Sequence, residues 1–132
     1  MRVKFLSTDL WDESADEDDD VPDPSWQEIE SAIRVLDGKK RTIVTLDAGG
    51  EWHLAVGGGS ANRYVVYMTF DNMSFLNLLS REKADRTVTL FVGGQDSLFP
   101  DNTVVDIALA LRAAKAFAET GQADPSCKWS QA

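Results

Sequence analysis

Five consecutive acidic residues restrict the possible folds of this chain more than any other feature: Asp16, Glu17, Asp18, Asp19 and Asp20. An unbroken run of like charges repels itself, so it resists burial and does not fold alone. The run lies within residues 6–32, which hold 11 acidic residues and no lysine or arginine. The rest of the chain has 11 acidic and 13 basic residues, so the net charge of −9 arises in this stretch. We therefore expect an exposed acidic loop over about residues 8–24.

The remainder of the chain has the size and composition of one folded domain. The length is 132 residues and 43% of them are apolar, which is typical of a single soluble domain spanning residues 1–132. No stretch approaches the ~20 apolar residues that cross a bilayer, and the N-terminus lacks the apolar segment of a secretory signal. We expect no contact with a membrane.

Charge and cysteine content restrict the partners and the compartment. The sequence pI is about 4.4, and phosphate contacts require lysine and arginine, so we expect no direct binding of nucleic acid. An acidic chain is suited to a basic partner instead. Cys127 is the only cysteine, which excludes an intramolecular disulfide and a cysteine-based metal site. A reducing cytoplasm is the expected location.

Two segments have helical periodicity. Residues 26–36 place apolar side chains on one stripe, and Ser25 and Glu28 before and within it have the spacing of a capping box. A longer helix is predicted over Asn102–Thr120, with Asp101 or Asn102 as its cap, and Gly121 is placed to end it.

The remaining regular segments have the pattern of strands, and Phe75–Leu79 fits a helical turn or a loop equally well. The predicted strands are Arg2–Leu6, Thr42–Leu46, Glu51–Val56, Tyr64–Phe70 and Thr87–Val92, with a short one at Lys128–Ser130. The predicted fold class is α+β, a mainly antiparallel sheet of about five strands with two helices packed on it.

The sequence offers little support for catalysis. His53 is the only histidine, and it has no companion motif for nucleophilic chemistry. Gly57–Ser60 lacks the Gly-Lys-Ser/Thr ending of a phosphate-binding loop, and the acidic run lacks the central glycine and final glutamate of an EF-hand. We expect no catalytic residue, no metal site and no cofactor.

The C-terminal third contains a recognisable order of short motifs. Phe91-Val92-Gly93-Gly94-Gln95 is followed by Phe99-Pro100, a helix through residues 113–117, Thr120-Gly121 and finally Trp129. This order resembles the immunity protein family one of bacterial polymorphic toxin systems, over about residues 42–129. We expect six of these residues to serve the fold, with Pro100 fixing the backbone ahead of the helix: Gly93, Gly94, Phe99, Pro100, Gly121 and Trp129.

The resemblance implies that the protein is a stoichiometric inhibitor and not an enzyme. Members of that family neutralise a toxin made by the same cell, and some are paired with nucleic-acid deaminases. A toxin that acts on nucleic acid presents a basic cleft, and our hypothesis is that the acidic run occupies such a cleft in place of phosphates. Trp11 beside the run is an expected anchor, so the predicted binding residues are Trp11, Asp16, Glu17, Asp18, Asp19 and Asp20.

Two other functions stay open at this point. One is an acidic adaptor or nucleic-acid mimic for another basic partner. The other is a small hydrolase that uses an aspartate or glutamate, which would require rigidly placed carboxylates with one pKa raised by burial.

Overall fold

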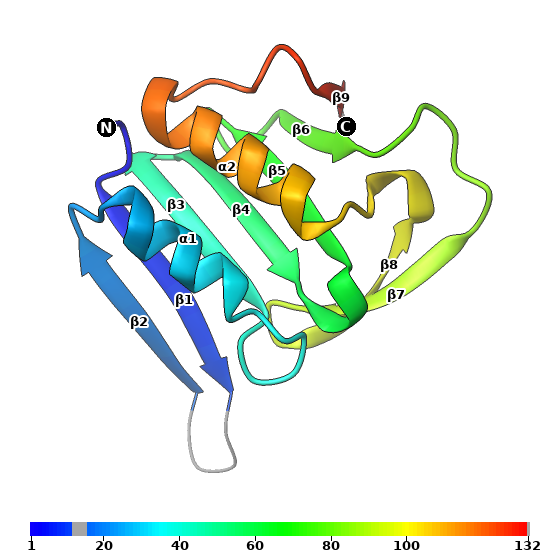
Figure 1. Cartoon of the computed structure of the whole chain (residues 1–132), viewed down its shortest axis with the longest axis horizontal. Helices are drawn as coiled ribbons and strands as arrows, with labels where there is room; N and C mark the ends of the chain where they lie inside the picture. The colour runs from blue at the N-terminus through cyan, green and yellow to red at the C-terminus, as the bar shows by residue number, and fades with distance from the viewer. Residues whose placement is uncertain (12–15, 132) are drawn as a thin grey trace.

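The computed structural model of the chain describes residues 1–11 and 16–131, with the backbone alone at residues 11 and 16–19. Over this part it contains two helices, nine strands and two short 3-10 turns (Figure 1). The helices are α1 (Trp26–Arg34) and α2 (Ile107–Thr120), and the 3-10 turns are η1 (Ser60–Asn62) and η2 (Asp101–Thr103). The strands are β1 (Phe5–Trp11), β2 (Asp16–Pro22), β3 (Ile43–Gly49), β4 (Trp52–Gly58), β5 (Tyr64–Thr69), β6 (Phe75–Leu79), β7 (Thr87–Val92), β8 (Gln95–Pro100) and β9 (Lys128–Gln131).

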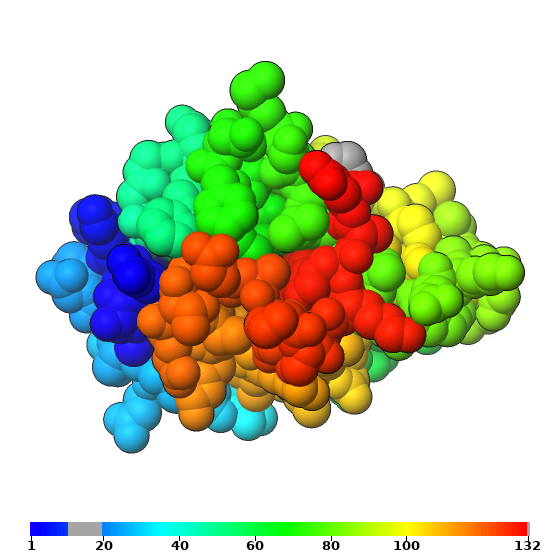
Figure 2. Space-filling model, turned by 90° about the horizontal axis from the view of Figure 1, so that it is seen from above, coloured from blue at the N-terminus to red at the C-terminus, as the bar shows by residue number. Residues whose placement is uncertain are grey.

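Seven of the strands form one antiparallel sheet in the order β2-β1-β3-β4-β5-β6-β9, and β7 and β8 form a separate hairpin. Both helices lie on the same face of the seven-stranded sheet, α1 toward β1 and α2 across β4 and β5 (Figure 1). Seen from above, α2 and the C-terminal segment lie together along one side of the molecule (Figure 2). The sheet therefore has one helix-covered face and one face without helices.

The core lies between the helices and the central strands. Alternate residues of β3 are buried, as expected for a strand with one face on a core. In β4 the last five residues are all buried, and Leu54 and Val56 belong to the core beneath the helices. Helix α1 contributes Ile29 and Ile33, which are fully buried on its apolar stripe. Helix α2 contributes small residues and Phe117, and these alanines allow it to approach the sheet closely.

The hairpin of β7 and β8 packs against the helix-free face at one end of the sheet. Gly57 follows Val56 and so faces away from the helices. A Cβ atom at Gly57 would lie 2.5 Å from Cγ1 of Val92, which shows how closely β7 approaches β4 there. Only a glycine leaves room for this contact.

The prediction of an α+β fold with two helices and a mainly antiparallel sheet is confirmed, but the strand count of about five was too low. Strand β6 occupies Phe75–Leu79, where a helical turn or a loop was considered, and it pairs with β5 and β9. Strands β2 and β8 were also missed. Their side chains do not alternate between apolar and polar, because main-chain pairing needs no apolar side chain at an edge.

The start of the long helix also differs from the prediction. Helix α2 begins at Ile107 with Asp106 as its N-cap, whose carboxylate accepts a hydrogen bond from the Leu109 N–H at 2.9 Å. The segment before it forms η2, and Pro100 ends strand β8 rather than directly preceding the helix. In the described part of the chain, neither helix is long and apolar enough to cross a membrane.

Candidate functional site

The acidic run forms strand β2, not a loop. Residues 16–22 pair with β1 in unbroken antiparallel register, from Trp11 opposite Asp16 to Phe5 opposite Pro22. The expectation of an exposed loop over residues 8–24 was therefore wrong for the residues in β1 and β2, and residues 12–15 lie outside the described part. The physical reason is that a strand with one face and one edge in water can carry charges that a core strand cannot.

The predicted binding residues lie along this ribbon of two strands. Trp11 is the last residue of β1, and Asp16, Glu17, Asp18 and Asp19 follow one another in β2. Asp20 is exposed, and its carboxylate accepts a hydrogen bond of 2.6 Å from the Ser7 hydroxyl on β1. The pairing gathers all six residues in one ribbon at the edge of the sheet. Their part in binding stays a prediction.

A buried carboxylate fixes β1 to the start of β3. Asp9 is 8% exposed, and one of its oxygens accepts hydrogen bonds from the Thr42 N–H at 2.7 Å and the Ile43 N–H at 2.9 Å. Its other oxygen accepts a hydrogen bond from the Thr42 hydroxyl. The same hydroxyl oxygen accepts from the Gly94 N–H at 3.3 Å, which connects the turn between β7 and β8 to this site. The ribbon of β1 and β2 is thus anchored by a buried carboxylate that accepts hydrogen bonds from the protein itself.

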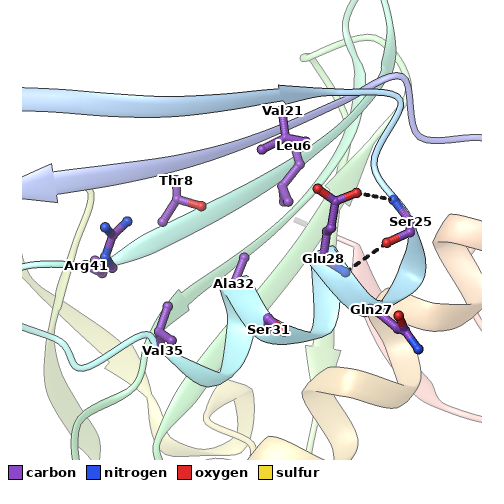
Figure 3. A pocket seen from close by; sticks show the side chains of 10 residues that line it. All are labelled: Leu6, Thr8, Val21, Ser25, Gln27, Glu28, Ser31, Ala32, Val35 and Arg41. Carbon is purple, nitrogen blue, oxygen red and sulfur yellow. Dashed lines mark hydrogen bonds between the residues drawn. The ribbon is translucent and has the colours of Figure 1, made fainter.

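A groove of about 460 Å³ runs between α1 and the ribbon of β1 and β2 on the helix side of the sheet (Figure 3). Leu6 and Val21 line it from the strands, and Ala32 and Val35 line it from α1. Val35 is 53% exposed although it is apolar. The groove exists because α1 covers β1 and leaves the helix-side face of β2 uncovered. Its remaining lining residues are polar: Thr8, Ser25, Gln27, Glu28, Ser31 and Arg41.

The helical wall of the groove is fixed at both ends. At its start, the Ser25 hydroxyl accepts from the Glu28 N–H at 3.1 Å and the Glu28 carboxylate accepts from the Ser25 N–H at 3.0 Å, as the capping box predicts (Figure 3). After the helix, the Asp37 carboxylate accepts from the N–H groups of Lys39, Lys40 and Arg41. Partial burial works to raise the pKa of Asp37, but these hydrogen bonds outweigh it and lower the pKa. Both ends of the groove therefore rest on ordered backbone.

Both ring nitrogens of His53 lie within hydrogen-bond distance of neighbouring groups of the protein. Nδ1 of His53 lies 2.9 Å from the Glu51 carbonyl oxygen, which can only accept, so Nδ1 carries the proton of the neutral ring. Nε2 then accepts from the Tyr67 hydroxyl at 3.2 Å. Burial raises the pKa of Tyr67. Within residues 1–11 and 16–131, no group of three or more histidine, cysteine, aspartate or glutamate side chains is arranged to hold a metal ion.

The six motif residues of the C-terminal third lie apart from the groove. Gly93 and Gly94 form the turn between β7 and β8 at φ values of 63° and 84°, and Phe99 and Pro100 end β8 opposite Val88 and Thr87. Gly121 ends α2 at φ 75°, and a Cβ there would lie 2.3 Å from the Trp52 ring. In β9, the Trp129 indole N–H donates to the Asp124 carbonyl at 3.0 Å. Each has a structural contact or turn position, whereas their part in function stays untested.

The residues that sequence reasoning missed are those of the groove and the buried Asp9. The signal for Val21 was weak, because one valine after five acids has no partner in a periodic pattern. Val35 falls beside the apolar stripe of α1, and only the placement of β2 shows that it faces a groove. Asp9 is one of 11 acidic residues in its stretch, and nothing in the sequence separates it from the rest.

Comparison with models of protein families gives a match over most of the chain. The family model described as immunity protein Imm1 matches residues 17–131, which include β2 from its second residue, both helices and the whole of the groove lining except Leu6 and Thr8. A search of curated proteins found no match.

Proposed function

The chain belongs to the Imm1 family of immunity proteins, and from this membership we propose that it binds and neutralises a cognate bacterial toxin by covering the toxin's substrate cleft. The observation that carries the proposal is the family match over residues 17–131. It agrees with the resemblance that the motifs between Phe91 and Trp129 indicate.

The acidic ribbon supports a basic cleft as the target. Strand β2 carries five consecutive acidic residues and lies at the outer edge of the sheet, where a partner can reach it. Opposite charges steer two proteins together and increase the association rate. A toxin that acts on nucleic acid, such as a deaminase, has a positively charged cleft for phosphates, so we propose a toxin of this class. Covering the cleft would exclude the nucleic acid.

An inhibitor of this kind needs no reaction of its own. Both ring nitrogens of His53 are engaged, one by a carbonyl oxygen and one by the Tyr67 hydroxyl. The carboxylate of Asp9 accepts from two main-chain N–H groups and one hydroxyl, so its hydrogen bonds serve to fix β1 to β3. These contacts favour a stoichiometric inhibitor over a carboxylate-dependent hydrolase. We propose that it acts in the cytoplasm of the cell that makes the toxin.

We expect a toxin to be encoded immediately upstream of this gene, and neutralisation of that toxin is the test. We expect cells that produce this toxin to survive only when the protein is produced with it, and the purified proteins to form a 1:1 complex. Toxin activity in vitro should fall linearly with added protein and reach zero near one equivalent. Residual activity that persists at several equivalents would contradict the proposal.

The binding measurement also distinguishes an immunity protein from the alternative, an acidic adaptor for another basic partner. The acidic strand on its own is compatible with that role, because charge does not identify the partner. The control is an unrelated basic protein with the same net charge as the toxin. Equal affinity for that control and for the toxin would favour the adaptor.

A further inference from the structure

We propose that β2 is the docking edge for the toxin. An extended segment of the toxin, rich in lysine or arginine, pairs with the outer edge of β2 and places apolar side chains in the groove beside α1. This inference rests on the proposed function, because the occupant is the toxin, and it adds where and how the toxin binds.

The first observation is the open edge. Strand β2 ends the seven-stranded sheet, and in the part of the chain that the structure describes no strand pairs with its other side. All seven of its residues are in register with β1, so the edge is regular over about 23 Å at ~3.3 Å per residue. Alternate N–H and C=O groups of such a strand point away from its partner and can pair with an added strand.

The opposite edge is a poorer site for the same interaction. Strand β9 has four residues, against seven in β2. It carries Lys128, which lies 3.6 Å from Glu82, and its Trp129 ring is partly buried against the core. A basic segment would meet a lysine at β9 and five acids at β2.

The second observation is the groove. It adjoins β2 through Val21 and lies on the helix side of the sheet, where successive strands are covered by α1 and α2 (Figure 3). A strand added outside β2 would present every second side chain to this side. Val21, Ala32 and Val35 provide an apolar surface for those side chains, and the exposed fraction of Val35, 53%, shows that the chain itself leaves this surface open.

Charge selects the occupant. Opposite charges on neighbouring strands stabilise pairing, and like charges directly opposite destabilise it. The run Asp16–Asp20 therefore accepts a lysine- or arginine-rich strand and rejects both an acidic strand and a second copy of β2. The same charges protect the free edge from unwanted pairing.

Hydrogen exchange of the complex with the cognate toxin tests whether a segment of the toxin forms main-chain hydrogen bonds with β2. Free β2 should exchange its outward N–H groups rapidly, and the complex should slow their exchange at least tenfold. The N–H groups of β9 serve as the internal control and should not change. Unchanged exchange in β2 within a saturated complex would overturn the inference.

Two pairs of variants test the groove. Ala32→Trp fills the groove from α1, and Ala116→Trp makes the same change at a partly buried position of α2 outside it. Val35→Arg and Met73→Arg change two exposed apolar residues, one at the groove and one on the turn between β5 and β6. We expect the groove variants to raise the Kd for the toxin at least tenfold and the control variants less than twofold. Because Val35 is exposed, its variant keeps the test valid if Ala32→Trp does not fold.

The outcomes distinguish this inference from the function on which it rests. A toxin that is bound and inhibited by all four variants with equal Kd would overturn β2 docking and leave the immunity function intact. A toxin that forms no complex with the parent protein would overturn both.

Discussion

Strands β2 and β4 have the same length and both lie in antiparallel pairs, yet their compositions have little in common. Strand β4 lies in the middle of the sheet, with a strand on each side, and five of its seven residues are buried. Strand β2 lies at the edge with five acidic residues and a single strand beside it. Main-chain pairing can hold a strand of almost any composition at the edge of a sheet, whereas burial restricts a central strand to apolar and small residues. We therefore expect stability to depend on β4, and we propose that recognition depends on β2.

The sharpest test of this division compares one apolar side chain in each strand. Leu54→Ala in β4 removes a fully buried side chain beneath the helices and should lower the free energy of unfolding by about 3–5 kcal/mol. Val21→Ala in β2 removes a partly buried one and should lower it by less than ~1 kcal/mol. Urea unfolding measures both. Equal losses would show that β2 belongs to the core after all.

Asp9 is buried and fixes β1 to the start of β3, whereas Asp20 on β2 is exposed. Asp9→Ala leaves the N–H groups of Thr42 and Ile43 without their acceptor in a buried site. Unsatisfied buried donors are costly, so we expect a loss of about 2–3 kcal/mol in the free energy of unfolding. Asp9→Asn keeps one acceptor oxygen and should lose less. A variant as stable as the parent would mean that β1 is held by its main-chain pairing alone.

Neutralising β2 should separate binding from folding. Replacing Asp16–Asp20 by serine and asparagine should change the free energy of unfolding by less than ~1 kcal/mol, because the substitutions keep the main-chain pairing that holds β2 to β1. The association rate with the toxin should fall by about tenfold or more at low salt, and its salt dependence should flatten. The dissociation rate should change less, because it depends on packed groups. Association at the parental rate would show that the acidic run aids solubility and does not steer the toxin.

Acidification should lower the stability of the fold slightly through Asp101, a carboxylate outside the ribbon of β1 and β2. Burial works to raise the pKa of Asp101, but the Asp85 N–H at 3.0 Å and the Arg81 guanidinium at 2.7 Å outweigh it and lower the pKa. A folded-state pKa below the unfolded value of 3.8 stabilises the fold above about pH 4. This stability is lost as the pH falls through the lowered pKa.

Thermal unfolding between pH 5 and pH 2 measures this loss. Asp101→Asn should unfold at a lower temperature than the parent at pH 5, and the difference should shrink toward pH 2. A constant difference across this range would show that the ionised carboxylate is not what stabilises this turn.

The fold could be predicted wherever one face of an element is buried. The stripe through Ile29 and Ile33 gave α1, and alternation gave β3, β4 and β7, because burial on one face imposes a period on the sequence. Strand β8 carries no such period. The start of α2 shows the same difficulty, since Asp101, Asn102 and Asp106 all satisfy the rules for a helix cap before the tertiary contacts are known.

The candidate site could be predicted in part. Charge marked Asp16–Asp20 as a surface, because charge is visible in the sequence without any structure. The groove was not visible, since it depends on which strand lies beside α1, and the pairing of Leu6 with Val21 is a tertiary fact. The sequence therefore predicts the charged part of the candidate site, whose role in binding stays a prediction, and it missed the apolar groove.

The order of the elements has a consequence for synthesis of the protein. Helix α2 covers β4 and β5 but follows them in the chain (Figure 1). Between the end of β5 at Thr69 and the end of α2 at Thr120, a ribosome working at ~5–20 residues per second needs roughly 3–10 s. During that interval the apolar side chains of Leu54 and Met68 have no helix above them. A nascent chain is therefore open to aggregation until α2 emerges, and a chaperone that shields apolar strands would protect it for those seconds.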